Sequence, residues 1–164
     1  MRLSRFKSGW KLHSKNTRRY NMKKFLFYFL SFTWGLPITL IGLIVATFLI
    51  LLGYKPNKYG LCWYFSIGEN WGGLNLGLVF ITDQRNNPHT KIHEHGHGVQ
   101  NCIFGPLMPI LVCIPSVARY WYREWLVRSG RKKYDELPDY YSIWFEGSAT
   151  ALGHYVMKGH DKYE

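Results

Sequence analysis

The stretch Thr90-Lys-Ile-His-Glu-His-Gly-His-Gly-Val-Gln-Asn101 decides how this chain is read, because it contains the pattern H-E-x-x-H. Residues four apart lie on one face of a helix, so His93 and His97 can bind one metal ion. Glu94 lies beside that face, where it can accept a proton from a water on the metal. The pattern is short, and its interpretation therefore depends on a helix, a preceding strand and a third ligand.

The flanking sequence predicts the helix and the strands. Thr90 is a plausible N-cap for a helix over residues 91–104, which Gly105 and Pro106 would end. Gly96 and Gly98 each disfavour that helix by about 1 kcal/mol, which indicates that another backbone packs closely against it. Apolar and aromatic runs at residues 61–67 and 74–82 predict two strands, separated by a glycine-rich turn and followed by a polar loop. Gly77 is expected to form a bulge or a close backbone contact.

A third metal ligand is expected from elsewhere in the chain, because a catalytic zinc ion takes three protein ligands and keeps one position for water. The candidates are Glu124, Asp135, Glu136, Asp139, Glu146, His154 and His160. Glu146 is preferred, since it lies in an apolar segment, residues 139–157, predicted to be a helix, where an unpaired carboxylate would be costly. Thr150, one turn further on, can orient a ligand through a hydrogen bond. His95 lies on another face of its helix and is expected to support the site indirectly or to be exposed.

Charge and hydropathy patterning predict a membrane segment. The chain of 164 residues has a formal net charge of +11, and nine of its Lys and Arg residues, with no acidic residue, lie in residues 1–24. Residues 25–54 follow without a charge, whereas about 20 apolar residues span a bilayer. We therefore expect a basic tail at 1–24, one transmembrane helix at 25–54 with a kink near Gly35 and Pro37, and a metal domain at 55–164.

This arrangement also predicts the partners and the location of the chain. A basic segment before a membrane helix marks the cytoplasmic side, so the expected location is the cell membrane, with one span, a cytoplasmic N-terminus and the metal domain on the opposite face. Membrane lipid is an expected partner, and no nucleic-acid partner is expected, because the membrane flank explains the basic charge. Residues 103–118 are either domain core or a surface that dips into the membrane. Residues 119–125 mix aromatic and Arg side chains. This mixture is typical of a segment at the level of the lipid headgroups, but also of an ordinary helix with a charged, solvated face.

Three groups of residues together resemble a known family: His93-Glu-His-Gly-His97, Gln100, and Glu146-Gly-Ser-Ala-Thr150. They look like the gluzincin class of zinc metallopeptidases, and are most similar to small bacterial membrane proteins with an H-E-x-G-H-x-x-Q motif. The resemblance implies an α+β fold in which a zincin-like domain, with an edge strand or β-hairpin, a motif helix and a C-terminal helix, follows the membrane helix. It departs from the family at Thr150, where thermolysin-like members carry a carboxylate.

The resemblance also implies roles for individual residues. His93, His97 and Glu146 would bind one Zn²⁺ and Glu94 would be the general base of a membrane-anchored hydrolase that cleaves a peptide or protein substrate. Supporting or transition-state roles fall to Gln100, Thr150, His154 and Tyr155. The strand before the motif helix would pair with the substrate through Leu76, Gly77, Leu78, Val79 and Phe80. The alternative is a catalytically weak or inactive zinc-fold protein that acts in the membrane as an interaction module.

Overall fold

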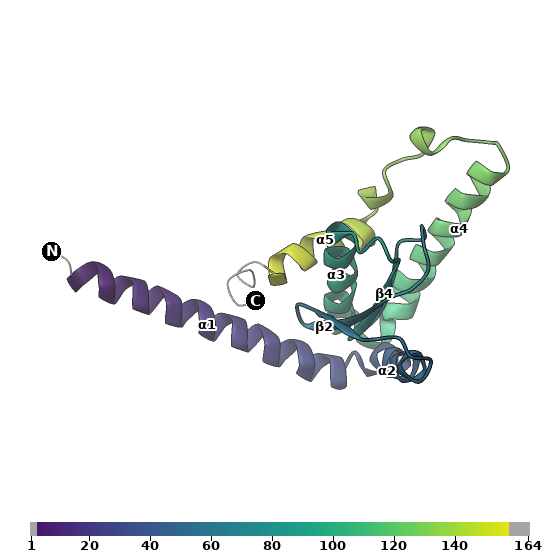
Figure 1. The fold of residues 1–164 in the computed structure, drawn as a ribbon. Helices are drawn as coiled ribbons and strands as arrows, with labels where there is room; N and C mark the ends of the chain where they lie inside the picture. Colours follow the sequence, from purple (N-terminus) through teal and green to yellow (C-terminus); the bar gives the residue numbers. More distant parts are fainter. Residues whose placement is uncertain (1–2, 158–164) are drawn as a thin grey trace.

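The chain folds into a small four-stranded sheet surrounded by helices, in a computed structural model that describes the backbone of residues 3–157 and the side chains of residues 18–157 (Figure 1). The helices are α1 (Leu3–Phe32), α2 (Leu36–Leu51), α3 (Pro88–Phe104), α4 (Ile114–Arg128) and α5 (Trp144–Met157). Short helical turns are η1 (Gly105–Leu107), η2 (Pro109–Cys113), η3 (Tyr134–Glu136) and η4 (Tyr140–Ser142). The strands are β1 (Asn57–Tyr59), β2 (Cys62–Ser66), β3 (Gly73–Leu76) and β4 (Val79–Thr82). The architecture is α+β.

The strands are arranged in the order β1-β2-β4-β3, which makes β3 an edge strand. The β2–β4 pair is parallel and the other two pairs are antiparallel. The single strand predicted at residues 74–82 is wrong, because Gly77, with φ +76°, reverses the chain between β3 and β4. The Asn75 side chain stabilises this turn by accepting a hydrogen bond from the Gly77 amide at 2.8 Å. A glycine at the first central position is typical of a two-residue hairpin turn.

The motif helix α3 lies between the sheet and α5, and it begins earlier than predicted. Its N-cap is Asn87, whose Oδ1 accepts a hydrogen bond from the His89 amide at 2.9 Å, and Pro88 occupies the first helical position. The N-cap predicted at Thr90 is therefore wrong, since Thr90 lies inside the first turn. Asn87 satisfies a free helix N–H group, and proline loses nothing at a position where no hydrogen bond is made.

Close backbone packing against α3, expected from its glycines, is confirmed. A Cβ atom on Gly96 would lie 1.7 Å from the carbonyl oxygen of Ala149 in α5. A Cβ atom on Gly98 would lie 2.9 Å from the carbonyl oxygen of Gly77. The two glycines thus let α5 and the β3–β4 turn approach α3 from two sides.

The N-terminal basic segment and the apolar segment form two helices, α1 and α2. Helix α1 runs from Leu3 through the predicted boundary at residue 24 to Phe32, and the break before α2 falls where Gly35 and Pro37 predicted a kink. Among the described residues, no single helix is long and apolar enough to cross a bilayer. Two bent pairs of helices are long and apolar enough when each pair is taken together, by length and composition alone. They are Arg18–Phe32 with Leu36–Leu51, bent by 87°, and Pro88–Leu107 with Pro109–Arg128, bent by 118°.

Residues 25–54 pack into the same body as residues 55–157, so the predicted boundary at residue 54 does not separate two packing units. Phe27 of α1 is buried with Phe80 and Cys102, and Leu49 of α2 is buried with Phe65 and Val79. The Asn101 side chain in α3 donates hydrogen bonds to the Gly35 carbonyl and the Thr39 hydroxyl, at 2.9 and 3.2 Å. The C-terminal half of α1 and α2 therefore support the sheet and the motif helix, while their outer faces stay apolar and exposed.

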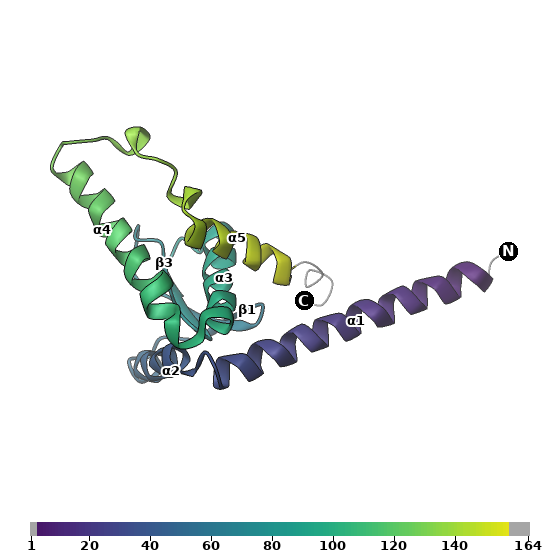
Figure 2. The same cartoon turned by 180° about the vertical axis from the view of Figure 1, so that it is seen from behind.

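Helix α4 runs along one side of the molecule, and residues 129–143 return from its far end to α5 (Figure 2). None of its side chains is fully buried. The helix predicted at residues 139–157 begins only at Trp144, because residues 140–142 form the turn η4, which Asp139 caps. The run at 103–118 contains buried core residues, Met108 and Val112, and exposed apolar ones, Ile110 and Ile114.

Candidate metal centre

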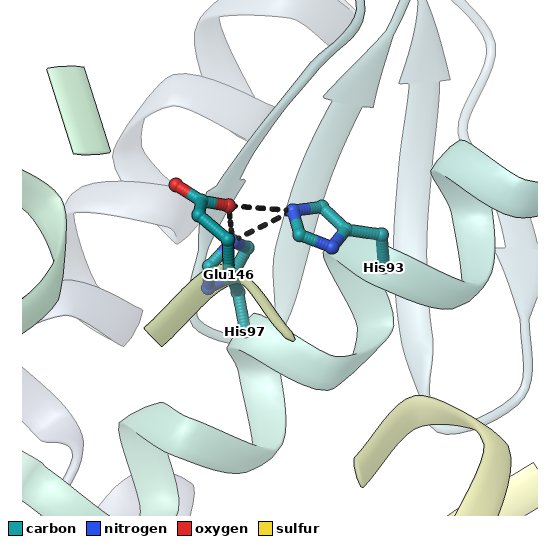
Figure 3. Close-up of side chains that lie close together, drawn as sticks. All are labelled: His93, His97 and Glu146. Atoms are coloured by element: carbon teal, nitrogen blue, oxygen red, sulfur yellow. Dashed lines mark hydrogen bonds and ion pairs between the residues drawn. The ribbon is translucent and has the colours of Figure 1, made fainter. Parts of the chain in front are cut away.

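The side chains of His93 and His97 point from one face of α3 towards Glu146 on α5 (Figure 3). The two imidazole Nε2 atoms lie 3.0 Å apart. The Glu146 Oε2 atom lies 3.0 Å from His93 Nε2 and 3.4 Å from His97 Nε2. All three residues are buried, and their ligand atoms lie within 4.8 Å of one another. The structure therefore brings together the two ligands of the motif and the carboxylate preferred from the sequence.

The three residues fit a tetrahedral metal ion. Zinc ligands at about 2.0–2.1 Å in tetrahedral geometry are separated from one another by about 3.3 Å, close to the distances seen here. Among the described residues, no group donates a hydrogen bond to Glu146 Oε2. A buried carboxylate oxygen without a donor is costly, and a cation at the centre of the three atoms removes that cost. A His-His-Glu cluster of this kind could hold one metal ion.

Gln100 determines the tautomer of one ligand. Its side-chain amide donates to the Phe145 carbonyl at 2.7 Å and to the Ser148 hydroxyl at 2.9 Å, so its Oε1 faces His97. That oxygen lies 2.7 Å from His97 Nδ1, which must therefore carry the proton. The Nε2 atom is left with its lone pair directed at the cluster, as a metal ligand requires. The same amide ties α3 to the first turn of α5.

His93 and Glu146 are also each held by a polar side chain on the side away from the cluster. Thr150 Oγ1 lies 2.9 Å from His93 Nδ1, the contact expected of a residue that orients a ligand. The Ser116 hydroxyl, on α4, donates a hydrogen bond to Glu146 Oε1. Each ligand is thus held by one further polar side chain, and the three supports come from α3, α4 and α5.

The charges of the cluster are strongly coupled. Burial lowers the pKa of the His93 imidazole. Burial would also lower the pKa of His97, but the nearby carboxylates of Glu146 and Glu94 outweigh it, and the pKa of His97 is raised. Burial alone would raise the pKa of Glu146, yet its contacts with the two imidazoles hold that pKa well below its usual range. The Glu146 carboxylate is therefore ionised, the charge state in which it can bind a metal.

Glu94 lies under the edge strand, next to the cluster and outside it. Its side chain is buried against Gly73, where a Cβ atom would lie 2.5 Å from Glu94 Oε1. Asn75 fixes the turn of α3 that carries it, by donating a hydrogen bond to the Glu94 carbonyl at 2.8 Å. Burial raises the pKa of Glu94 to about 7. The carboxylate is thus close to the ligands without being one of them.

A cavity of about 260 Å³ opens over the cluster and contains Glu94, His93, His97 and Glu146 in its wall. One side is formed by residues 71–75 around β3, and the other by η2 and α4. Tyr140 and Tyr141 of η4 also line it, with the Tyr141 ring centroid 5.1 Å from that of His93. Sequence reasoning missed these tyrosines, Gly73 and Ser116, because each lies on a turn, edge or helix whose place beside α3 is set by tertiary packing.

Several predicted site residues lie elsewhere. His154 and Tyr155 are exposed near the end of α5, where Lys23 of α1 lies 3.9 Å from the centre of the Tyr155 ring, so the structure does not bring them to the cluster. The predicted substrate strand is also misplaced. Leu76 ends β3, Gly77 and Leu78 form the turn, and Val79 and Phe80 are buried in β4, an interior strand. The edge beside the metal cluster is residues 73–75.

The remaining candidates for the third ligand do not reach the cluster. Glu124 on α4 pairs with Arg128 and accepts a hydrogen bond from Tyr134 of η3. The others within the described residues are exposed: Asp135, Glu136, Asp139 and His154. His160 lies outside the described residues. His95 is buried, so the alternative that it is exposed on the surface is wrong. Its Nε2 accepts a hydrogen bond from the Leu61 amide at 3.2 Å.

Comparison of the chain with protein-family models, with curated proteins and with solved structures finds no match. The function therefore has to be argued from the metal cluster and the cavity above it.

Proposed function

We propose that the protein is a membrane-associated, zinc-dependent hydrolase of the gluzincin type that cleaves a peptide bond. The observation that carries this proposal is the combination of three convergent ligands with Glu94 beside them, at the wall of an open cavity. A purely structural zinc site takes four protein ligands, whereas a catalytic one keeps a position open. The cluster has three candidate ligands and faces a cavity.

His93, His97 and Glu146 would hold the ion, which when bound lowers the pKa of a water ligand to about 7 and polarises a carbonyl group. Glu94 is the general base, which accepts a proton and passes it to the leaving amine. The hydroxyl groups of Tyr140 and Tyr141 are donors available to an oxyanion, since burial raises the pKa of Tyr140 to about 12 and keeps it protonated.

A peptide is the favoured substrate because an edge strand borders the cavity. Residues 72–75 line it, and an edge strand offers free backbone N–H and C=O groups to an extended chain. Gly73 has no side chain, which lets the Glu94 carboxylate pack directly against this edge strand. The expectation that lipid is a partner rests on the apolar side chains exposed on α1 and α2. No nucleic-acid partner is proposed.

The test is the variant Glu94→Gln in the full chain, assayed with a mixture of quenched fluorescent peptides. We expect the variant to retain its zinc and its fold, because Glu94 is not a ligand, and to lose hydrolysis by roughly 10² or more. Glu124→Gln, a partly exposed surface glutamate, is the matched control and should change neither. Loss of zinc in Glu94→Gln, or turnover equal to that of the wild type, would refute the role assigned to this residue.

The alternative is a zinc-fold membrane protein with little or no activity, and Thr150 is the feature that favours it. A neutral hydroxyl beside His93 Nδ1 stabilises the ligand less than the carboxylate that thermolysin-like gluzincins carry there. The Glu94→Gln comparison decides between the two proposals, because an inactive protein shows no difference between the variant and the wild type.

A further inference from the structure

The cavity above the metal cluster has an apolar wall made by η2 and α4. Met108, Val112, Cys113, Val117 and Tyr120 line it, opposite the polar wall that carries the ligands. Met108 and Val112 are buried, so this wall is a built part of the site. Its chemistry suits an apolar side chain next to the bond that is cleaved.

The same segment carries an exposed apolar stripe. Its members follow one another at helical spacing on one side of η2 and α4: Ile110, Ile114, Val117, Trp121 and Trp125. Between 47% and 65% of each of these side chains is exposed. Val117 belongs both to the stripe and to the lining of the cavity, so the stripe continues into the metal site.

The stripe begins at the apolar end of the molecule. The turn η1, just before it, packs against α2, and Figures 1 and 2 both show the start of α4 at the end where α2 lies. Exposed apolar side chains of α2 and of η1 to α4 thus gather at this end. Further along α4, Trp121 and Trp125 are interspersed with Arg119, Arg123 and Arg128, the mixture found at the level of lipid headgroups.

The opposite side of the cavity is the edge strand. Leu74, 41% exposed, lines the cavity from β3 as Val117 does from α4, so two apolar side chains frame its open side. An extended peptide paired with residues 73–75 would direct alternate side chains towards α4.

From these contacts we propose that the substrate is a membrane-inserted peptide segment that enters the site along the η2–α4 stripe, with its extended backbone against β3 and an apolar side chain in the cavity. This proposal rests on the proposed peptidase activity. It adds where the substrate comes from and which surface selects it. A peptide free in water would lack the apolar contacts outside the cavity and would be bound less well.

The test uses the full, zinc-loaded chain in vesicles of phosphatidylcholine and phosphatidylglycerol. Each quenched fluorescent peptide is made with apolar residues at its centre, with and without a leucine-rich membrane segment. We expect the anchored form to be cleaved at least tenfold faster. Trp121→Asp, outside the cavity, should remove this advantage and leave cleavage of the free peptide unchanged. Tyr155→Asp, equally exposed but on α5 and away from the stripe, is the matched control and should leave both rates unchanged.

A second measurement separates this proposal from the activity itself. A photo-reactive side chain in place of Trp121, which lies in the stripe and outside the cavity, should cross-link the anchored peptide and not the free one. The same group in place of Tyr155, exposed on α5, should cross-link neither. Cross-linking without cleavage would refute the peptidase and leave the binding surface intact. Cleavage of both peptides at equal rates without a cross-link would overturn the binding surface and leave the peptidase intact. Release of fatty acid from the vesicles without a peptide cross-link would overturn the peptide as the occupant.

Discussion

A methyl group on Gly96 would lie 1.7 Å from the carbonyl oxygen of Ala149, so the motif helix and α5 touch through their backbones at this point. The contact lies between His93 and His97 on α3 and within one turn of Glu146 on α5. It therefore sets the separation of the two helices that carry the candidate metal cluster.

Gly96→Ala should separate α3 from α5 and disturb the metal cluster. Overpacking of a core costs about 1–3 kcal/mol, and we expect a loss of unfolding free energy at the upper end of that range, because backbone atoms must move. Thermal unfolding of the apo protein measures the loss, and zinc titration should show weakened binding. Ile103→Ala, at an exposed position of the same helix, is the control and should have a much smaller effect. A Gly96→Ala variant as stable as the wild type would show that α3 and α5 are not in backbone contact.

Thr150→Val should weaken zinc binding without unfolding the protein. Valine has the shape of threonine but cannot interact with His93 Nδ1, and loss of such a supporting group typically lowers metal affinity by about 10–100-fold. Competition with a zinc chelator measures the affinity. Thr150→Ser, which keeps the hydroxyl group, should restore most of it. Equal affinities for the valine and serine variants would show that the hydroxyl does not orient the ligand.

Asn87→Ala should destabilise the start of α3 by about 1 kcal/mol, the usual cost of removing an N-cap side chain. Thr90→Ala should cost less, because Thr90 lies inside the first turn and does not cap the helix. Denaturant unfolding of the two variants gives the comparison. If Thr90→Ala were the less stable of the two variants, Thr90 would be the N-cap, as predicted from the sequence.

The bias of Lys and Arg towards residues 1–24 still predicts a cytoplasmic N-terminus. Because α2 packs along the sheet, we expect the α1–α2 pair to enter the membrane with the domain beside it and not to carry the domain across. In sealed cells, tags at both ends should then resist external protease. Digestion of the C-terminal tag alone would instead support the single crossing predicted from the sequence, with the metal site on the outer face.

The three residues of the candidate metal cluster could be predicted because their signal is local. The four-residue spacing of His93 and His97 needs only a helix, and Glu146 stands out as a carboxylate in an apolar segment. The close packing at Gly96 was likewise indicated by a residue that a helix otherwise disfavours. In each of these cases the residue type and its immediate sequence context were enough to indicate its role.

The rest of the site depends on contacts between distant parts of the chain. Tyr141 and Ser116 reach the cavity only because η4 and α4 lie against it, and nothing in their flanking sequence distinguishes them. The turn at Gly77 was missed because the apolar run around it looks like one strand. The capping signal Asn87-Pro88, by contrast, was available in the sequence. The break between α1 and α2 falls where Gly35 and Pro37 indicated a kink, but composition does not reveal that Phe27 and Leu49 are buried in the domain core.

The central claim, that His93, His97 and Glu146 bind one zinc ion, is tested most directly by measuring the metal content of the purified chain. Elemental analysis of the wild type should give about one zinc per chain, as one site with three protein ligands requires. His97→Ala and Glu146→Gln should each lose most of the metal, whereas Glu124→Gln, a surface glutamate paired with Arg128, should retain it. One zinc per chain in all four proteins, or none in the wild type after growth in zinc, would contradict the account.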